Sequence, residues 1–287
     1  MKIRKVGITS KSRQSEIEPT LAALVSWLRE RHIEVLMDEE TGAAVESAGS
    51  CLSRPEMASL ADLLIVLGGD GTLLATARAV NDRPVPMLAV NLGGLGFLTV
   101  TTLEELYPTL EMVLAGNYHS EPRVRLKAEV LRNGETVSSY LALNDAVLNK
   151  GAIARVLDFD VWVDRRFMST YKSDGLIVAT PTGSTAYSLA AGGPVVVPQV
   201  NAFIVTPICA HTLTNRAIVL PDSVSLEIAM RDHQESVYLT VDGQVAVELR
   251  SNDRVRIKRA ACSIEVIQPP YKTYFDILRQ KLKWGER

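Results

Sequence analysis

One stretch decides the fold: Ala61-Asp62-Leu63-Leu64-Ile65-Val66-Leu67-Gly68-Gly69-Asp70-Gly71-Thr72. Its apolar run has the length of a strand buried on both faces, and the glycines that stop it precede a helix-prone segment, residues 72–80. A second apolar strand, residues 87–90, ends at another glycine cluster, residues 93–96. Strands that alternate with helices in this way predict a parallel, doubly wound α/β sheet.

The same alternation extends toward the N-terminus and then stops. Residues 2–10 and 33–37 read as short strands around a helix from Ile17 to about His32, residues 38–60 as a small-residue loop, and residues 103–115 as a helix. Beyond Gly116-Asn117 the hydrophobic pattern acquires a period of two, with a turn at Asn133-Gly134. Strands are expected at 124–131, 136–147, 160–164, 176–179, 238–241 and 255–258.

The expected fold class is therefore an α/β, doubly wound N-terminal domain followed by a β-rich, mostly antiparallel C-terminal domain. We expect the first domain to span residues 1–117 and the second residues 118–265. Residues 266–287 should form a helix that packs back on the first domain, with Tyr274, Phe275, Leu278 and Leu282 on one face.

Composition excludes several classes of protein. The 287 residues carry a formal charge of 31 − 33 = −2, so no global basic field exists to hold a nucleic acid or an anionic membrane. No apolar stretch approaches the length of a membrane span, and no signal peptide is visible. The three cysteines, Cys51, Cys209 and Cys262, are far apart, as is typical of reduced thiols in a cytoplasmic protein.

The glycine motif at residues 68–72 has the chemistry of a phosphate site. Glycines let the backbone N–H groups approach an anion, and the N-terminus of the following helix adds a favourable dipole. Asp70 is a poor phosphate ligand because like charges repel, so its role is to accept a proton from a hydroxyl or to bind a metal ion. The alternative is an aspartate that only caps the helix.

Two further glycine or hydroxyl clusters are less decisive. Residues 91–97 resemble part of a dinucleotide fingerprint but have Thr99 where a third glycine would stand, so a tight turn explains them equally well. Residues 171–188 hold the longest run of small polar side chains, which leaves room for a ligand. Ser184 lacks the flanking glycines of a hydrolase nucleophile.

Two acidic pairs leave alternatives open. Asn144-Asp145 interrupts an apolar run, where a buried carboxylate needs partners. A ligand with paired hydroxyls would supply them, and so would a β-bulge bonded to its own backbone. Asp242-Gly243-Gln244 taken alone is a hairpin turn. The basic stretch at residues 254–259 is typical of a solvated face.

Together, and in this order along nearly the whole chain, these motifs resemble the NAD kinases. The resemblance rests on Gly68-Gly69-Asp70-Gly71-Thr72, Asn144-Asp145, the run from Asp174 to Tyr187, and Asp242-Gly243-Gln244. The first motif alone is shared with lipid kinases of the diacylglycerol and sphingosine type. One departure is Asp145, where the family often has glutamate.

The resemblance implies transfer of the γ-phosphoryl group of ATP to the 2′-hydroxyl of the adenosine ribose of NAD, with a divalent metal such as Mg²⁺. Asp70 would be the catalytic base, and no metal ligand is assigned. Phosphates of ATP would be bound by Gly68, Gly69, Gly71 and Thr72. Contacts to NAD are implied for Asp70, Gly71, Asn144, Asp145, Arg155, Lys172, Asp174, Thr185, Ala186, Tyr187, Ser188, Leu189, Ala190 and Gln244.

The partners implied are therefore NAD and ATP, without nucleic acid or membrane. The resemblance also implies a homo-oligomer, a dimer or a tetramer, to which residues 203–205 could contribute unless they form a core strand. Two alternatives differ in class: a lipid kinase, and a dinucleotide-binding sensor in which Asp70 only caps a helix.

Overall fold

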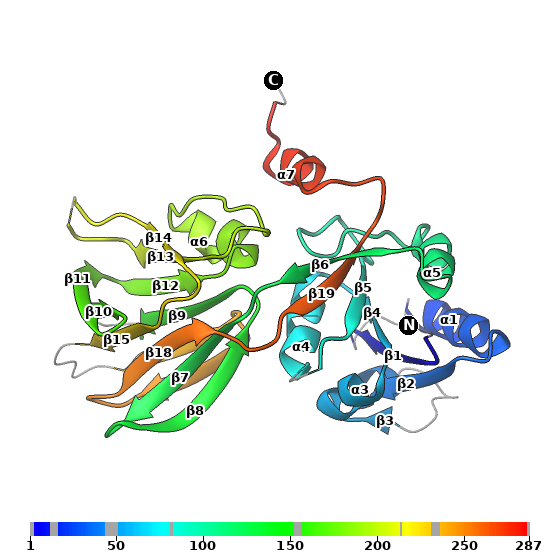
Figure 1. The fold of residues 1–287 in the computed structure, drawn as a ribbon, viewed down its shortest axis with the longest axis horizontal. Coiled ribbons are helices and arrows are strands. Elements are labelled where there is room, and N and C mark those ends of the chain that lie inside the picture. The colour runs from blue at the N-terminus through cyan, green and yellow to red at the C-terminus, as the bar shows by residue number, and fades with distance from the viewer. Residues whose placement is uncertain are drawn as a thin grey trace. The chain divides into compact units, whose positions relative to one another are not determined.

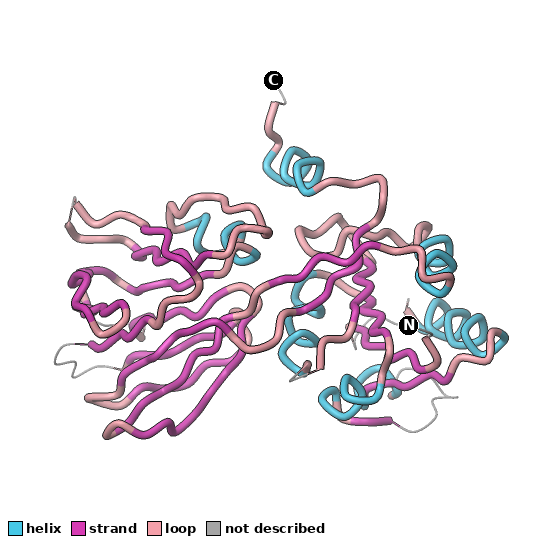
Figure 2. Tube along the Cα trace, in the orientation of Figure 1, coloured by secondary structure: helices cyan, strands magenta, loops and turns pink. Residues whose placement is uncertain are grey.

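The computed structural model describes residues 3–11, 17–43, 51–80, 83–151, 156–212, 214–230 and 236–285. The chain divides into two compact units, and each is described by itself. Unit 1 combines residues 1–122 with residues 264–287, and unit 2 comprises residues 123–263. The predicted fold class is confirmed: unit 1 is α/β, and unit 2 is built mostly of antiparallel strands (Figure 2).

Unit 1 is built on a seven-stranded sheet in the order β3-β2-β1-β4-β5-β19-β6. Its strands are β1 (Lys5–Ser10), β2 (Glu34–Asp38), β3 (Cys51–Leu52), β4 (Leu63–Leu67), β5 (Pro86–Val90), β6 (His119–Arg123) and β19 (Ile264–Gln268). The pairs β1/β2, β1/β4, β2/β3, β4/β5 and β5/β19 are parallel. Every residue of β4 is buried, as its unbroken apolar run predicts for a central parallel strand.

The helices of unit 1 include one pair that the sequence analysis missed. They are α1 (Glu18–Glu30), α2 (Glu39–Gly42), α3 (Arg54–Leu60), α4 (Asp70–Ala79), α5 (Leu106–Leu114) and α7 (Tyr274–Leu282). The expectation of a plain loop over residues 38–60 is wrong, because α2, β3 and α3 lie there. The start of α3 carries a readable signal: Glu56 accepts a hydrogen bond from the backbone N–H of Ser53, a capping box.

The chain returns to unit 1 after unit 2. Strand β19 runs between β5 and β6 (Figure 1), so residues from the two ends of the sequence complete one sheet. Residues 118–122 and 264–265, which the sequence-based division assigned to the β-rich domain, belong to unit 1 because β6 and β19 lie in its sheet.

Helix α7 follows β19 in unit 1, and of the four residues expected on its packed face Leu278 is buried but Phe275 is not. Ile277 and Leu278 are buried, whereas Phe275 is 55% exposed. Its first turn is fixed by Thr273 and Asp276, which form a capping box. The helix therefore presents to the unit the face that contains Ile277 and Leu278.

Unit 2 consists of two six-stranded antiparallel sheets whose inner faces share one hydrophobic core. One sheet has the order β11-β10-β15-β18-β7-β8 and the other β14-β13-β12-β9-β16-β17. The first contains β7 (Leu126–Arg132), β8 (Glu135–Ala142), β10 (Leu157–Val163), β11 (Arg166–Ser173), β15 (Leu226–Met230) and β18 (Arg254–Arg259). The second contains β9 (Asp145–Lys150), β12 (Gly175–Ala179), β13 (Ala202–Ile208), β14 (Ile218–Pro221), β16 (Val237–Val241) and β17 (Val245–Leu249).

A short 3₁₀ helix, η1 (Thr182–Thr185), and the four-residue helix α6 (Tyr187–Ala190) lie after β12. Residues around them cover a smaller hydrophobic cluster on the second sheet, formed by Val147, Ile177, Ala179 and Ile204. Residues 203–205 are completely buried in β13, so they form a core strand and not an exposed interface.

The single strand expected over residues 136–147 is wrong. It is two strands, β8 and β9, which belong to different sheets. The chain changes sheet at Leu143-Asn144, where the backbone N–H groups of residues 143, 144 and 145 donate to the carboxylate of Asp242. That carboxylate replaces the ladder partners that a continuous strand would have used.

Phe203, in the hydrophobic core of unit 2, and the exposed Phe275 provide a matched test of the assigned core. Phe203→Ala should lower the free energy of unfolding by about 3 to 5 kcal/mol, because it leaves a cavity in a completely buried site. Phe275→Ala should change it by less than about 0.5 kcal/mol. Urea unfolding followed by circular dichroism measures both. Should Phe203→Ala be insoluble, Phe203→Leu should still cost about 1 kcal/mol. Equal effects at the two positions would contradict the assignment of the core.

Candidate active site

In unit 1, three neighbouring parallel strands end at one edge of the sheet. Lys11 follows β1, residues 68–70 follow β4, and residues 91–96 follow β5. These segments, together with Lys281 of α7, line a cavity of about 290 Å³. Ligands of open α/β sheets collect at this edge. The two glycine motifs that the sequence analysis treated separately thus line the same cavity.

Asp70 joins these motifs through its carboxylate. Its Oδ1 accepts hydrogen bonds from the backbone N–H groups of Leu98 and Thr99, at 3.1 and 3.0 Å, and from the Thr99 hydroxyl at 3.0 Å. Its Oδ2 accepts one from the N–H of Phe97, at 2.9 Å. Asp70 is the first residue of α4, with Gly69 as the N-cap, so these bonds fasten the loop after β5.

The glycines of this edge fall into two kinds. A Cβ atom on Gly96 would lie 2.1 Å from Oδ1 of Asp70, and one on Gly68 would lie 2.4 Å from the Thr72 hydroxyl. Contacts within the protein therefore require glycine at positions 68 and 96. A Cβ on Gly69 or Gly94 would meet nothing within 4 Å, so those positions border open space. Gly71 and Thr72 lie in the first turn of α4, beside the residues that line the cavity.

In unit 2, a second pocket of about 280 Å³ lies on the outer face of the sheet that contains β9. Asp145, Val147 and Asn149 alternate along β9 and therefore share that face, and Thr240 of β16 is paired with Val147. Asn144, Ala186, Tyr187, Asp242 and Gly243 complete the lining. The Asn144-Asp145 pair and the Asp242 turn are thus brought together here.

Two side-chain oxygens of this pocket are buried without a hydrogen-bond partner in the protein. They are Oδ1 of Asn144 and Oδ1 of Asn149. An unpaired buried acceptor costs free energy, and a ligand N–H or hydroxyl group removes that cost. Sequence analysis missed Asn149, because only the pairing of β9 with β16 shows that it shares a face with Asp145.

Asp145 and Asp242 are two carboxylates in one small space. Asp145 is 4% exposed. Burial, followed by the negative charge of Asp242, raises the pKa of Asp145 from 3.8 to about 7. Asp242 occupies the hairpin turn between β16 and β17, with a φ of 49°, and is stabilised by the three backbone donors described above. The turn and the functional interpretations of residues 242–244 are therefore compatible.

The other expected contacts lie around this pocket without lining it. Ser188 is buried, and its hydroxyl bonds that of Thr206 at 2.9 Å. The Thr185 hydroxyl donates to the carbonyl of Thr182. Leu189 and Ala190 follow in α6, and Gln244 is exposed in the hairpin turn. Arg155 lies outside the described residues.

Lys172 and Asp174 lie at the junction of β11 and β12. The Asp174 carboxylate forms an ion pair with Lys150 at 2.8 Å, next to Asn149 at the end of β9. Lys172 is exposed, and its carbonyl accepts the backbone N–H of His211. Ser184 is buried and holds Val196 through two hydrogen bonds, which explains this serine structurally.

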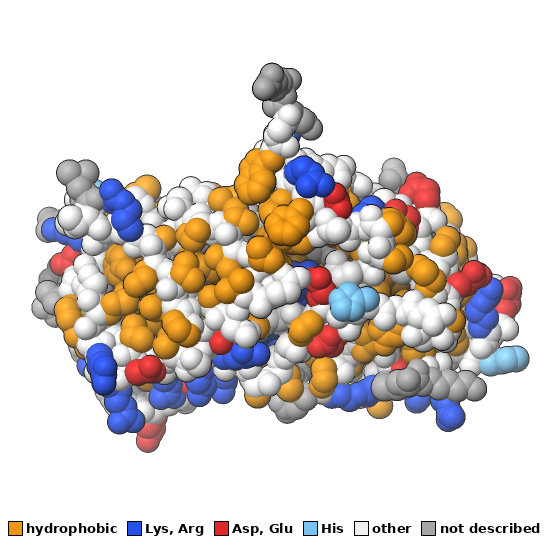
Figure 3. Space-filling model, turned by 45° about the horizontal axis from the view of Figure 1, so that its top comes forward, with side chains coloured by type: hydrophobic (Ala, Val, Ile, Leu, Met, Phe, Trp, Pro, Cys, Tyr) orange, Lys and Arg blue, Asp and Glu red, His pale blue; other side chains and the backbone are white. Residues whose placement is uncertain are grey.

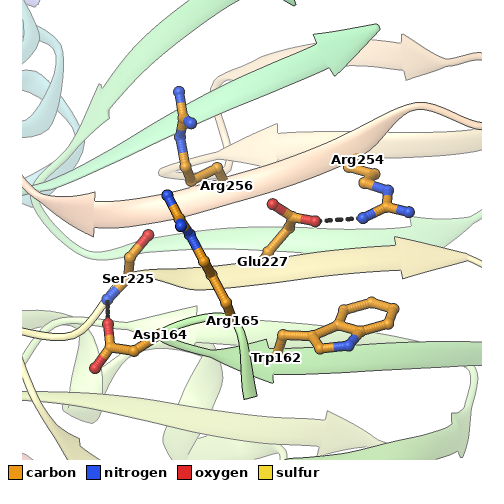
Figure 4. A pocket seen from close by; sticks show the side chains of 7 residues that line it. All are labelled: Trp162, Asp164, Arg165, Ser225, Glu227, Arg254 and Arg256. Atoms are coloured by element: carbon orange, nitrogen blue, oxygen red, sulfur yellow. Dashed lines mark hydrogen bonds and ion pairs between the residues drawn. The ribbon is translucent and has the colours of Figure 1, made fainter. Parts of the chain in front are cut away.

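Another cavity of unit 2, of about 590 Å³, contains none of the expected residues. It lies over β10, β15 and β18 and is lined by Trp162, Arg165, Glu227 and Arg254, among others (Figure 4). Glu227 already pairs with Arg254 at 2.6 Å. This groove is a face of the sheet on which acidic and basic side chains pair with each other.

The basic stretch on β18 is likewise paired with acidic side chains. Despite its burial, Glu129 has its pKa lowered to about 2 by hydrogen bonds from Lys127, Arg256 and Lys258. Arg259 pairs with Asp222 at 2.7 Å. On the face drawn in Figure 3, acidic side chains stand beside basic ones at several places.

The described residues offer no preformed metal cluster, disulfide or membrane-spanning helix. There, no group of three or more His, Cys, Asp or Glu side chains is placed to hold a metal ion. All three cysteines lie in that part of the chain, and none is in a disulfide. None of the helices described combines the length and apolar character needed to cross a membrane.

Comparison with known proteins identifies the family. A model of the ATP-NAD kinase N-terminal domain matches residues 6–118, and a model of the ATP-NAD kinase C-terminal domain matches residues 143–268. The chain belongs to the ATP-NAD kinase family. The NAD kinase of Solibacter usitatus is 50% identical over 286 residues, 99% of each chain. That of Geobacter metallireducens is 45% identical over 285 residues, 99% of this chain and 100% of its own.

Solved structures agree with this assignment. The crystal structure of yeast NADH kinase complexed with NADH matches with a TM-score of 0.90 and 26% identity, covering 100% of this chain and 89% of that one. An NAD kinase from Archaeoglobus fulgidus in complex with ATP matches with a TM-score of 0.78 over 97% of this chain and 98% of that one. At 22% identity, the second likeness concerns the fold alone. Neither comparison favours a lipid kinase or a non-catalytic sensor.

The contrast between Gly96 and Gly94 yields a test of the packing around Asp70. Gly96→Ala should lower the melting temperature, because the new methyl group would collide with the Asp70 carboxylate and the Thr99 hydroxyl. Gly94→Ala makes the same chemical change in open space and should leave the melting temperature within about 2 °C of the parent. Differential scanning calorimetry compares the two, and a larger loss for Gly94→Ala would refute the packing described.

Asp145 yields a pH-dependent test. Its pKa is higher in the folded kinase than in the unfolded chain, so stability falls as pH rises from about 4 to about 7 and the penalty is complete above that range. Asp145→Asn carries no such penalty. The variant should therefore gain about 2 kcal/mol more over the parent at pH 8.5 than at pH 5. Urea unfolding at both pH values measures this difference, and an equal gain at both would show that Asp145 titrates normally.

Proposed function

We propose that this chain transfers the γ-phosphoryl group of ATP to the 2′-hydroxyl of the adenosine ribose of NAD, giving NADP and ADP. The observation that carries the proposal is the cavity beside Asp70. A carboxylate there shares an edge of the parallel sheet with Gly69 and Gly94, whose positions leave room for a ligand. Membership of the ATP-NAD kinase family supports the same reaction.

In this proposal, Asp70 accepts the proton of the attacking hydroxyl. The new bond joins the 2′-oxygen to the γ-phosphorus, the bond to the β,γ-bridging oxygen breaks, and ADP leaves. Because Oδ1 already accepts three hydrogen bonds and Oδ2 only one, Oδ2 is the atom with capacity for the proton. The backbone N–H of Gly69 and the dipole of α4 would bind the phosphates of ATP, with Gly71 and Thr72 as further proposed contacts. The N–H of Gly68 already donates to the carbonyl of Val90 at 2.9 Å, so Gly68 would contribute by letting the backbone turn.

NAD would be bound by unit 2. The orphaned Oδ1 atoms of Asn144 and Asn149 would accept hydrogen bonds from its hydroxyl or amide groups. Asp145 would bind a hydroxyl pair, and Tyr187, 47% exposed at the pocket, would pack against a base. Thr185 through Ala190, Lys172, Asp174, Gln244 and Arg155 remain proposed contacts of the same ligand.

A divalent cation is proposed to arrive with ATP. The described residues contain no group of three or more His, Cys, Asp or Glu side chains placed to hold one, and no metal ligand from the protein is proposed. Phosphate oxygens and water are the usual ligands of Mg²⁺ in such sites. No step above depends on a metal ligand from the protein.

The proposed setting is the cytoplasm, and the proposed assembly is a homo-oligomer. Three cysteines without a disulfide support the first. Edge strand β14, with Ile218 and Val219 36% and 46% exposed, supports the second, because an exposed apolar edge favours pairing with another chain. Analytical ultracentrifugation of the purified chain tests the assembly, and a monomer at micromolar concentration would exclude it.

Substitution of Asp70 tests the reaction. The parent protein with NAD, ATP and Mg²⁺ should form NADP, measured with an NADP-specific dehydrogenase. Asp70→Asn should lower kcat at least about 100-fold, because it removes the proton acceptor, while the Kd for NAD stays within about threefold. Absence of NADP from the parent would refute the proposed function.

A control separates this chemical role of Asp70 from its role as a loop anchor. Thr99→Val removes one hydrogen bond to Oδ1 but leaves the carboxylate intact. It should lower kcat less than about tenfold. Equal losses in Asp70→Asn and Thr99→Val would mean that Asp70 acts only by holding the loop.

A further inference from the structure

The phosphate cavity of unit 1 contains two lysines that no glycine motif includes. Lys11 comes from the end of β1 and Lys281 from the last turn of α7, separated by most of the sequence. Sequence patterns gave no reason to assign either to a site. Among the described residues, neither forms an ion pair with an acidic side chain.

Lys281 is held in a defined position. Its Nζ donates to the backbone carbonyl of Leu95 at 2.8 Å and lies 5.6 Å from the centre of the Phe97 ring. It follows Ile277 by four residues and Leu278 by three, so it lies on the same side of α7 as these buried residues, while its own side chain is exposed. An ammonium group has three N–H donors, and the Leu95 carbonyl uses one of them.

A second lysine fastens the same helix to the same loop. Nζ of Lys272, just before α7, donates to the carbonyl of Val100 at 2.9 Å and to both carboxylate oxygens of Glu105. The loop after β5 is thus bound by the C-terminal segment at Leu95 and at Val100. Lys272 is neutralised by Glu105, whereas the charge of Lys281 faces the cavity.

We infer that Lys281, together with Lys11, binds the polyphosphate of the phosphoryl donor. The inference rests on the proposed function and adds to it the cations of the donor site. Glycine N–H groups supply only partial charges, whereas a triphosphate carries several full negative charges. Two ammonium groups that line the same cavity provide full positive charges for it. Helix α7 is then part of the donor site as well as part of the fold.

The test compares two lysines of the C-terminal segment. Lys281→Gln removes the charge but keeps an N–H donor for the Leu95 carbonyl, and Lys283→Gln makes the same change two residues later, outside the cavity. Calorimetric titration with inorganic tripolyphosphate and with ATP, without metal, measures binding apart from turnover. Lys281→Gln should raise both Kd values about tenfold or more and leave the Kd for NAD unchanged. Lys283→Gln should bind like the parent.

Further variants and conditions separate the possible outcomes. Lys281→Arg keeps the charge and should recover most of the affinity for tripolyphosphate. Raising the salt concentration should weaken tripolyphosphate binding more in the parent than in Lys281→Gln. If Lys281→Gln binds tripolyphosphate like the parent, the inference is wrong, whether or not the parent makes NADP. If the parent binds tripolyphosphate through Lys281 but makes no NADP from ATP, the proposed function fails while the anion site stands.

Discussion

The carboxylate of Asp70 is the constraint on which unit 1 depends at its ligand edge. Four hydrogen bonds from Phe97, Leu98 and Thr99 join the end of β4 to the loop after β5. The loop stays close enough that only glycine fits at position 96. A carboxylate immobilised in this way cannot rotate freely. The proposed proton acceptor is therefore held in one orientation before any ligand binds, which is the preorganisation that phosphoryl transfer requires.

Unit 2 uses an aspartate in a comparable way. Asp242 accepts three backbone N–H groups from residues 143–145, and so bends the chain from one sheet to the other. The same bend places Asp145 beside it, in a buried position where its charge is disfavoured. In each unit, an aspartate of one of the motifs shared with the NAD kinases also fastens the backbone of its pocket. Substitutions at either position will therefore mix structural and functional effects unless a control separates them.

Local patterns predicted much of the fold but not the composition of the pockets. The buried run of β4 and its glycines predict a parallel strand and a phosphate site, because both depend on neighbouring residues. The capping box at Ser53 and Glu56 is an equally local signal for the start of α3. The break between β8 and β9 depends on Asp242, a carboxylate 97 residues from Asp145. Lys281 and Asn149 likewise enter their pockets through pairings that only the folded chain shows.

The position of β19 governs the order in which the protein can fold during synthesis. Unit 2 is one continuous segment and has all its strands before β19 is made. Until β19 is made, the apolar strand β5 has a partner on only one side, and β6 lacks its only neighbour in the sheet order. The growing chain thus carries an open, hydrophobic sheet edge throughout the translation of unit 2, and β19, which is made after unit 2, closes it.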